Sequence, residues 1–274
     1  MKKILIGLLT TLLLSPLSGA EFAPTKPNPT DIRIIPVRPT PEPDNVETNI
    51  IFPSRGEVLS QSRMEVQVRL DGYPVGTQSS FDRRKQIWND PNGQSLRVII
   101  DTFDPFEIYL SFVDTLDQNN VFFNLTLNKQ IPFSLSSGVH AIRAFPIRSY
   151  GESLKQEGCF DAHLFYVNTK KGDQDVDLKG PYLTYNEPQE RVSYREGKPI
   201  LLDFYLSNVQ LSRDGYKVRI TINDDVVRIL TMWVPYYIYG LKSGEHKIHL
   251  ELLNEKNEVE PGLFNDVHKT IRVN

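Results

Sequence analysis

The sequence has 274 residues and a formal net charge of −3, with 24% charged and 10% aromatic residues. Apart from an excess of proline, 19 residues, these are the values of an ordinary folded protein, so collagen and wholly disordered proteins are excluded. Because the chain is mildly acidic and carries no block of basic residues, we do not expect it to bind nucleic acid or an anionic membrane surface.

The first 20 residues have the pattern of a removable export signal. Lys2 and Lys3 form a positive start, which is followed by an apolar run at residues 4–14. Ser18 and Ala20 provide the small residues of a cleavage site. An uncleaved anchor is the alternative, but the run is shorter than the ~20 residues that span a bilayer. We therefore expect cleavage, no transmembrane segment in the mature form, and a periplasmic, cell-surface or secreted location.

Residues 21–48 contain seven prolines and are expected to form an extended, largely solvated arm. Proline lacks the backbone donor that a helix or a sheet needs. Ile32, Ile34 and Ile35 form a short apolar island in this arm. The island could add a strand to a sheet edge, in this chain or in a partner. We favour the simpler interpretation, a spacer that holds the folded part away from an envelope surface.

Apolar residues alternate with polar ones after Asn49, which predicts strands that turn one face toward a core. The alternating segments are residues 64–70, 96–100, 106–112, 200–206, 218–222 and 248–252. Turn pairs such as Asp71-Gly72 and Ser243-Gly244 separate them. Since no ten-residue stretch shows a helical period, we expect an all-β fold built as antiparallel β-sandwiches.

An internal repeat relates the two halves of the chain. Residues 135–142 match residues 241–248 at five of eight positions. Residues 93–100 match residues 215–222 as well, with three identities in eight positions, and the offsets of the two matches differ by 16 residues. Repeated segments of this kind indicate tandem copies of one structural unit.

These matches predict two tandem Ig-like sandwiches, at residues 49–170 and 181–274. Residues 171–180 would be the linker between them. The difference in offset predicts an inserted hairpin near residues 104–130 of the first copy.

A Leu-x-x-Gly-x-His run at Leu135–His140 and again at Leu241–His246 opens an alternating strand in each copy. This run resembles the F–G hairpin of bacterial secreted Ig-like and fibronectin-III-like β-sandwich modules in tandem. The resemblance concerns the fold, and it implies a binding, spacing or adhesion element. The Cys…Trp…Cys set of antibody domains is missing from the sequence.

The common catalytic signatures are missing as well, including Gly-x-Ser-x-Gly, His-Glu-x-x-His and a phosphate-binding glycine loop, so we do not expect an enzyme. His140 and His246 are equivalent in the repeat, which predicts that each ring bonds the backbone of its neighbouring turn. Metal binding by these two is less economical, because His249 faces outward and His163 and His268 have no counterparts.

Asp173, Asp175 and Asp177 alternate at the predicted linker and could direct their carboxylates at one calcium ion. The pattern departs from an EF-hand loop, because Leu178 stands at the glycine position and Thr184 at the glutamate position. A solvated linker is the simpler interpretation. Apart from this calcium ion, we expect no cofactor.

Trp233, Tyr237 and Tyr239 share one side of a predicted strand, and Met232 and Val234 lie on the other. One side must face the core. The other presents apolar area, which in the case of the aromatic side could stack on sugar rings or contact a protein. Packing against the core and the neighbouring copy is the simpler interpretation.

Cys159 is the only cysteine, so the fold contains no internal disulfide. We expect a half-buried residue on a strand rather than a reactive thiol. Together, these patterns predict an exported, non-enzymatic interaction or envelope-associated protein whose partner is a protein or a cell-envelope component. The alternative is a carbohydrate-binding protein that uses the face of Trp233, Tyr237 and Tyr239.

Overall fold

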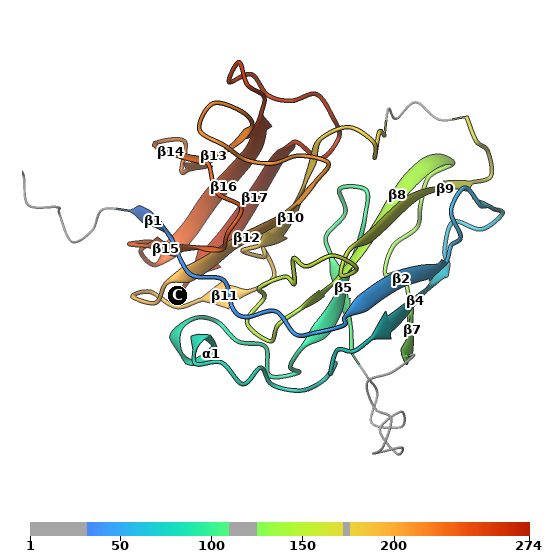
Figure 1. The fold of residues 1–274 in the computed structure, drawn as a ribbon, viewed down its shortest axis with the longest axis horizontal. Helices are drawn as coiled ribbons and strands as arrows, with labels where there is room; N and C mark the ends of the chain where they lie inside the picture. Colours follow the sequence, from blue (N-terminus) through green and yellow to red (C-terminus); the bar gives the residue numbers. More distant parts are fainter. Residues whose placement is uncertain (1–31, 110–124, 172–175) are drawn as a thin grey trace, which may run out of the picture.

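The computed structural model describes residues 32–109, 125–171 and 176–274, whose strands form two β-sandwiches that lie against each other (Figure 1). The all-β fold class expected from the alternation is confirmed. The predicted export signal at residues 1–20 lies outside the described residues, as do residues 110–124 of the predicted insertion.

The first sandwich packs a three-stranded sheet against a five-stranded sheet. The three-stranded sheet has the order β2 (Glu47–Phe52), β4 (Glu65–Asp71), β7 (Leu125–Gln130). The five-stranded sheet has the order β3 (Val58–Leu59), β9 (Asp161–Val167), β8 (Gly138–Ile147), β5 (Ser95–Ile100), β6 (Phe106–Ile108). A short helix, α1 (Arg83–Gln86), lies in the connection between β4 and β5.

The second sandwich packs a four-stranded sheet against another five-stranded sheet. The four-stranded sheet has the order β1 (Arg33–Pro36), β15 (Tyr236–Tyr239), β12 (Ile200–Ser207), β10 (Tyr182–Glu187). The five-stranded sheet has the order β11 (Ser193–Tyr194), β17 (Asp266–Val273), β16 (Gly244–Leu253), β13 (Lys217–Ile222), β14 (Val226–Leu230). In both sandwiches the neighbouring strands are antiparallel except for the short edge strands β3 and β11.

The strand order is the same in the two sandwiches once β1 is set aside. The sheet β2-β4-β7 corresponds to β10-β12-β15, and β3-β9-β8-β5-β6 corresponds to β11-β17-β16-β13-β14. The strand pairing therefore repeats along the chain as the sequence matches do. The proposed boundaries at residues 49–170, 171–180 and 181–274 stay a prediction.

The inserted hairpin expected near residues 104–130 lies largely at residues 110–124, outside the described residues, and stays a prediction. β6 pairs with β5 and β7 pairs with β4, so the two strands lie in different sheets. The second copy makes the same crossing from β14 to β15. The change of sheet between these strands therefore belongs to the repeated topology.

Each sandwich has its own apolar core, formed by the alternating residues. In the first core Val66, Val68 and Leu70 of β4 have no exposed surface, and in the second Ile220 and Ile222 of β13 have none. Full burial of such a side chain stabilises the fold by about 1.5–3 kcal/mol. The period-2 pattern in the sequence is therefore the cause of this two-layer packing.

Four strands, β5, β8, β10 and β12, are buried on both faces. Their inward residues fill the two cores, and their other residues face the neighbouring sandwich. Phe145 of β8 contacts Tyr205 of β12, with 5.9 Å between the ring centroids, and Phe160 stacks on Tyr205 at 4.4 Å. The sequence patterns predicted half-buried strands, and this contact between the sandwiches covers the half that was expected to face solvent.

The spacer interpretation of residues 21–48 is wrong for the part that the structure describes. Ile34 pairs with Ile238 and Ile35 with Tyr237, so β1 is an edge strand of the second sandwich. Pro36 is tolerated because an edge strand needs donors on one side only. The chain then runs across to β2 of the first sandwich (Figure 1). The segment from β1 to β2, which we call the strap, thus connects the two sandwiches.

We predict that the strap contributes to stability. Ile34 is half-buried against the second core, whereas Ile35 is 39% exposed. Ile34→Ala should lower the free energy of unfolding by about 1–2 kcal/mol because it removes buried apolar surface. The matched change Ile35→Ala should cost less than about 0.5 kcal/mol. Urea unfolding of the two variants measures both values, and equal losses would contradict the role of β1.

Candidate functional site

In each copy, a histidine near the start of a strand, His140 of β8 or His246 of β16, bonds the preceding turn. Nε2 of His140 donates a 2.9 Å hydrogen bond to the carbonyl of Ser136, and Nε2 of His246 donates a 2.7 Å bond to the carbonyl of Lys242. Both acceptors lie four residues before the histidine. The predicted bonding of the two repeated histidines to the turn backbone is confirmed.

The other ring nitrogen distinguishes the two copies. Nδ1 of His140 lies 2.6 Å from Oδ2 of Asp101, whereas Nδ1 of His246 lies 2.9 Å from the side-chain amide nitrogen of Asn223. Because the amide donates, His246 accepts at Nδ1 and its ring is neutral. His140 faces two acceptors, so both of its nitrogens donate and its ring is a cation. Burial lowers the pKa of His140, but the bonds to Asp101 and Ser136 outweigh it and raise the pKa overall.

A buried guanidinium connects the two sandwiches. Arg97 of β5 is 1% exposed, and its Nε donates a 3.0 Å bond to Oε1 of Glu107 on β6. Its Nη1 lies 2.9 Å from Oε1 of Glu187 and donates a 2.7 Å bond to the carbonyl of Asn186, both on β10. Arg191 forms an ion pair with Glu107 as well. One cation of the first sandwich is therefore held by two carboxylates, one from each sandwich.

Burial disfavours the charged form of Glu187 in this network. Burial raises the pKa of Glu187 to about 7, and the attraction of Arg97 opposes this only in part. The same burial lowers the pKa of Arg97, but the two carboxylates raise it overall, so the guanidinium stays charged. Removing one partner from such a network leaves an uncompensated buried charge, which costs about 3–5 kcal/mol.

A second polar cluster lies beside it. Asp203 of β12 has no exposed surface and accepts hydrogen bonds from Ser153, at 2.6 Å, and from Lys155, at 2.5 Å. The side-chain amide of Asn186 donates to the same carboxylate at 2.6 Å. Ser153 and Lys155 belong to the first sandwich and Asp203 to the second. The contact between the sandwiches is therefore specified by bonded polar groups in addition to the aromatic rings.

A cleft of about 390 Å³ opens between the two sandwiches above Arg97. The side chains of its wall that can stack on or bond to a ligand are Trp88, Asp90, Asn92, Glu107, Tyr109 and Arg191. The hydroxyl of Tyr109 donates a 2.7 Å bond to Oδ2 of Asp90. Burial and this bond raise the pKa of Tyr109, so its hydroxyl stays protonated. The cleft has the size of a small-ligand site, for which about 300–1,000 Å³ is usual.

A smaller cavity of about 140 Å³ lies between β17 and the first sandwich. Arg143 lines it and stacks over the ring of Phe264, with 3.8 Å from the guanidinium carbon to the ring centroid. Burial lowers the pKa of Arg143 to about 10, which leaves it charged at neutral pH. This cavity has room for a few water molecules.

Trp233, Tyr237 and Tyr239 do not form one exposed aromatic face. Tyr237 is 5% exposed and packs against Tyr150 and Leu201 where the sandwiches meet. Trp233 precedes β15, and its indole donates a 2.9 Å bond to the carbonyl of Phe204. Tyr239 is half-buried beside Tyr237. The exposed neighbour is Met232, at 50%.

The predicted calcium ligands are described only in part. Asp173 and Asp175 lie outside the described residues. Asp177 is exposed, and its two carboxylate oxygens accept bonds from the backbone nitrogens of Lys179 and Gly180, at 2.8 and 3.2 Å. Asp177 is thus engaged in its own turn. Calcium binding by the three aspartates stays a prediction.

Cys159 lies in a turn before β9 and has no exposed surface, so the expectation of a half-buried strand residue is wrong in both respects. Burial raises the pKa of its thiol to about 12, which makes it unreactive at neutral pH.

In the described part of the chain, no helix is long and apolar enough to cross a membrane.

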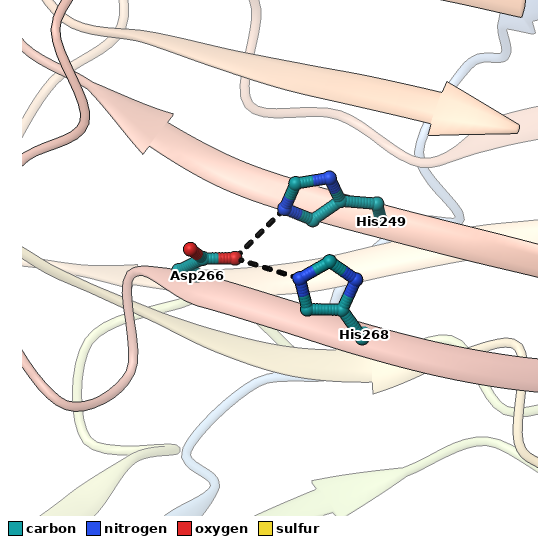
Figure 2. A group of neighbouring side chains, drawn as sticks. All are labelled: His249, Asp266 and His268. Carbon is teal, nitrogen blue, oxygen red and sulfur yellow. Dashed lines mark hydrogen bonds and ion pairs between the residues drawn. The ribbon is translucent and has the colours of Figure 1, made fainter. Parts of the chain in front are cut away.

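His249, Asp266 and His268 come together on the solvent face of β16 and β17 (Figure 2). Nε2 of His249 lies 2.7 Å and Nε2 of His268 lies 3.3 Å from Oδ1 of Asp266. The two imidazole rings stack with 3.8 Å between their centroids. Sequence reasoning treated His249 and His268 separately, because the two residues match no common motif. The signal that joins them is the strand register, in which they lie directly opposite.

No protein-family model and no curated protein matches the sequence. Solved structures that are similar to this chain include three at 11–14% identity. The fibronectin(III)-like modules of Clostridium thermocellum CbhA match at 11% identity, over 82% of this chain and 93% of that chain, with a TM-score of 0.28. SGBP-B of the Bacteroides ovatus mixed-linkage glucan utilization locus, in complex with a mixed-linkage heptasaccharide, matches at 14%, over 84% and 48%, with a TM-score of 0.18.

The third structure, native Escherichia coli alpha-2-macroglobulin, matches at 11% identity, over 84% of this chain and 17% of that chain, with a TM-score of 0.23. This chain therefore spans about half of the SGBP-B chain and a sixth of the macroglobulin chain. TM-scores of this size carry no argument about function. The sandwich architecture follows from the sheets of this chain themselves.

We predict unequal roles for the two turn-bracing histidines. His140→Ala should lower the free energy of unfolding by about 1–3 kcal/mol, because it leaves the buried Asp101 carboxylate without its cation. His246→Ala should cost less, since that ring is neutral and half-exposed. The pKa of His140 is raised on folding, so its contribution is complete below pH 6.5 and is lost as the pH rises through the folded pKa.

Urea unfolding at pH 6 and at pH 9 tests both statements. The loss caused by His140→Ala should shrink at the higher pH, and the loss caused by His246→Ala should not follow it. Equal losses for the two variants at both pH values would contradict a charged His140.

We also predict that Glu187 makes stability depend on pH. Its pKa rises from 4.5 to about 7 on folding, so the stability it contributes is complete below pH 4.5 and is lost as the pH rises through 7. Relative to wild type, Glu187→Gln should flatten the change in unfolding free energy between pH 5 and pH 8 by about 1–3 kcal/mol. The exposed Glu255→Gln is the control and should leave the curve unchanged. Identical curves for all three proteins would show that Glu187 does not titrate in this range.

Proposed function

We propose that the protein is an exported, non-enzymatic binding module of the cell envelope, in which the two sandwiches form one unit that holds a ligand in the cleft between them. The cleft is the observation that carries this proposal. Trp88 and Tyr109 of the first sandwich and Arg191 of the second lie on its walls. Because Arg97 holds the two sides together, the cleft exists before a ligand arrives, which lowers the entropic cost of binding.

A carbohydrate is the ligand class that fits the cleft best. The half-buried rings of Trp88 and Tyr109 offer faces on which the C–H groups of a sugar can stack. The exposed amide of Asn92 and the half-exposed guanidinium of Arg191 offer hydrogen bonds to sugar hydroxyls. The carbohydrate-binding alternative thus moves from the strand of Tyr237, which is covered, to the cleft.

A protein partner is the second candidate, and the edge strand β14 favours it. Val227 and Ile229 on this strand are 46% and 48% exposed, and Met232 just beyond it is 50% exposed. An edge strand with exposed apolar side chains is where a second chain can add a strand of its own. The glycan and the protein would then use different surfaces of the same module.

We predict that oligosaccharides from a bacterial envelope change the fluorescence of Trp88. The chain has two tryptophans, so Trp233→Phe leaves Trp88 as the single indole. In this background we expect saturable binding, and Tyr109→Ala should weaken it about tenfold, since loss of an aromatic contact costs about 1.4 kcal/mol. Calorimetry on the wild-type protein confirms the affinity.

Tyr239→Ala is the matched control, because that ring lies outside the cleft, and it should leave the affinity unchanged. Saturable binding that Tyr239→Ala weakens and Tyr109→Ala does not would contradict the cleft. Absence of binding for every oligosaccharide, together with a protein partner that is lost on Ile229→Lys, would favour the edge strand β14.

A further inference from the structure

We propose that His249, Asp266 and His268 bind one divalent first-row transition-metal ion, with Zn²⁺ as the ion that suits them best. The site lies on the solvent face of β16 and β17, where Asp266 and His268 also line the smaller cavity, and it shares no residue with the cleft. The proposal stands on the strand register, on the geometry of the three ligand atoms and on the chemistry of the donors.

The register places the three side chains on one face. His249 of β16 lies directly opposite His268 of β17, and Asp266 is two residues before His268. Opposite residues and residues two apart along a strand point to the same side of a sheet. Ile248 and Leu250, on the other side of β16, are fully buried in the core. The three candidate ligands therefore face solvent without any change of fold.

The ligand atoms converge on one point. Nε2 of His249, Nε2 of His268 and a carboxylate oxygen of Asp266 lie within 4.8 Å of one another (Figure 2). Bonds of about 2.0–2.1 Å to a tetrahedral zinc ion place two ligand atoms about 3.3 Å apart. The distance of 3.3 Å from Nε2 of His268 to Oδ1 of Asp266 equals this value, and the distance of 2.7 Å from Nε2 of His249 is shorter. The ion therefore requires the exposed side chains of His249 and Asp266 to move apart.

The donor set selects the kind of metal. Two imidazole nitrogens and one carboxylate suit zinc and its transition-metal neighbours, whereas calcium and magnesium prefer oxygen ligands alone. Asp266 and His268 are 52% and 72% exposed at their side chains, so the fourth position is open to water or to a donor from another molecule. Zinc sites that bind a water molecule or a substrate likewise have three protein ligands and one open position.

Charged neighbours of His249 on β13 and β16 form a neutral pair. Arg219, which lies opposite Glu251 in the register, is held by both oxygens of that carboxylate at 2.5 Å. Glu251 lies opposite Asp266 in the register, and its Oε2 is 3.8 Å from Nε2 of His249. The Arg219–Glu251 pair carries no net charge, and Asp266 supplies the negative charge of the site. Glu251 is thus a neighbour of the ion and not one of its three ligands.

The test uses the mature chain without a histidine tag, freed of metal by a chelator and titrated with Zn²⁺ against a chromophoric chelator. We expect one ion per chain, with His249→Gln and His268→Gln each weakening binding by tenfold or more and Asp266→Asn weakening it as well. His246→Gln is the control, because it removes a half-exposed imidazole of the same strand outside the cluster, and it should bind as the wild type does. Circular dichroism checks that each variant is folded.

Co²⁺ gives a second readout that does not depend on affinity. Cobalt in a four-coordinate site of nitrogen and oxygen ligands absorbs visible light, and this band should appear in the wild type and in His246→Gln but not in His249→Gln. Equal zinc binding by all four variants, or no stoichiometric binding by the wild type, would overturn the site. Neither outcome bears on the cleft, since no residue is shared between the two.

Discussion

The ion network of Arg97 is the constraint on which the arrangement of the molecule depends. Its guanidinium reaches Glu107 within the first sandwich and Glu187 in the second, and the residue is 1% exposed. Buried charges of this kind add little net stability, but they penalise every arrangement in which a partner is missing. Apolar packing between Phe145 and Tyr205 would tolerate a slide or a rotation, whereas the directional bonds of Arg97 do not. The cleft has a defined shape because this network fixes both of its walls.

The sequence predicted the strands well because the two cores are built from strict alternation. It predicted poorly what the other face of each strand does. Arg97 and Asp203 occupy positions that period 2 assigns to solvent, and both are buried between the sandwiches. Alternation shows only that two faces differ, and a polar residue can face water or a bonded partner from another sheet. The contact between the sandwiches pairs residues far apart in the chain, so no local pattern announces it.

The candidate sites also differ in whether a local pattern or a contact between distant parts of the chain defines them. The turn-bracing role of His140 and His246 could be predicted because the motif and its acceptor lie within one turn and recur in the repeat. The aromatic set of Trp233, Tyr237 and Tyr239 could not be judged, because the first sandwich covers Tyr237. The pair of His249 and His268 needed the register of β16 and β17, which the loop between the two strands sets. The proline content of residues 21–48 led to the wrong prediction of a spacer, since an edge strand tolerates the proline that a central strand would exclude.

The divergence of the two copies shows how the contact between them acts on local chemistry. Asp101 and Asn223 occupy the same place, and each bonds a ring nitrogen and the backbone nitrogen after the histidine. In the first copy the place adjoins the second sandwich, and the backbone carbonyl of Asp101 also accepts from Arg143. A carboxylate there balances the positive charge of His140 and attracts that of Arg143 inside the protein. In the second copy His246 is half-exposed, no buried cation needs balancing, and a neutral amide makes the same two bonds. The geometry of the turn is therefore kept by its hydrogen bonds, while its charge follows from its burial.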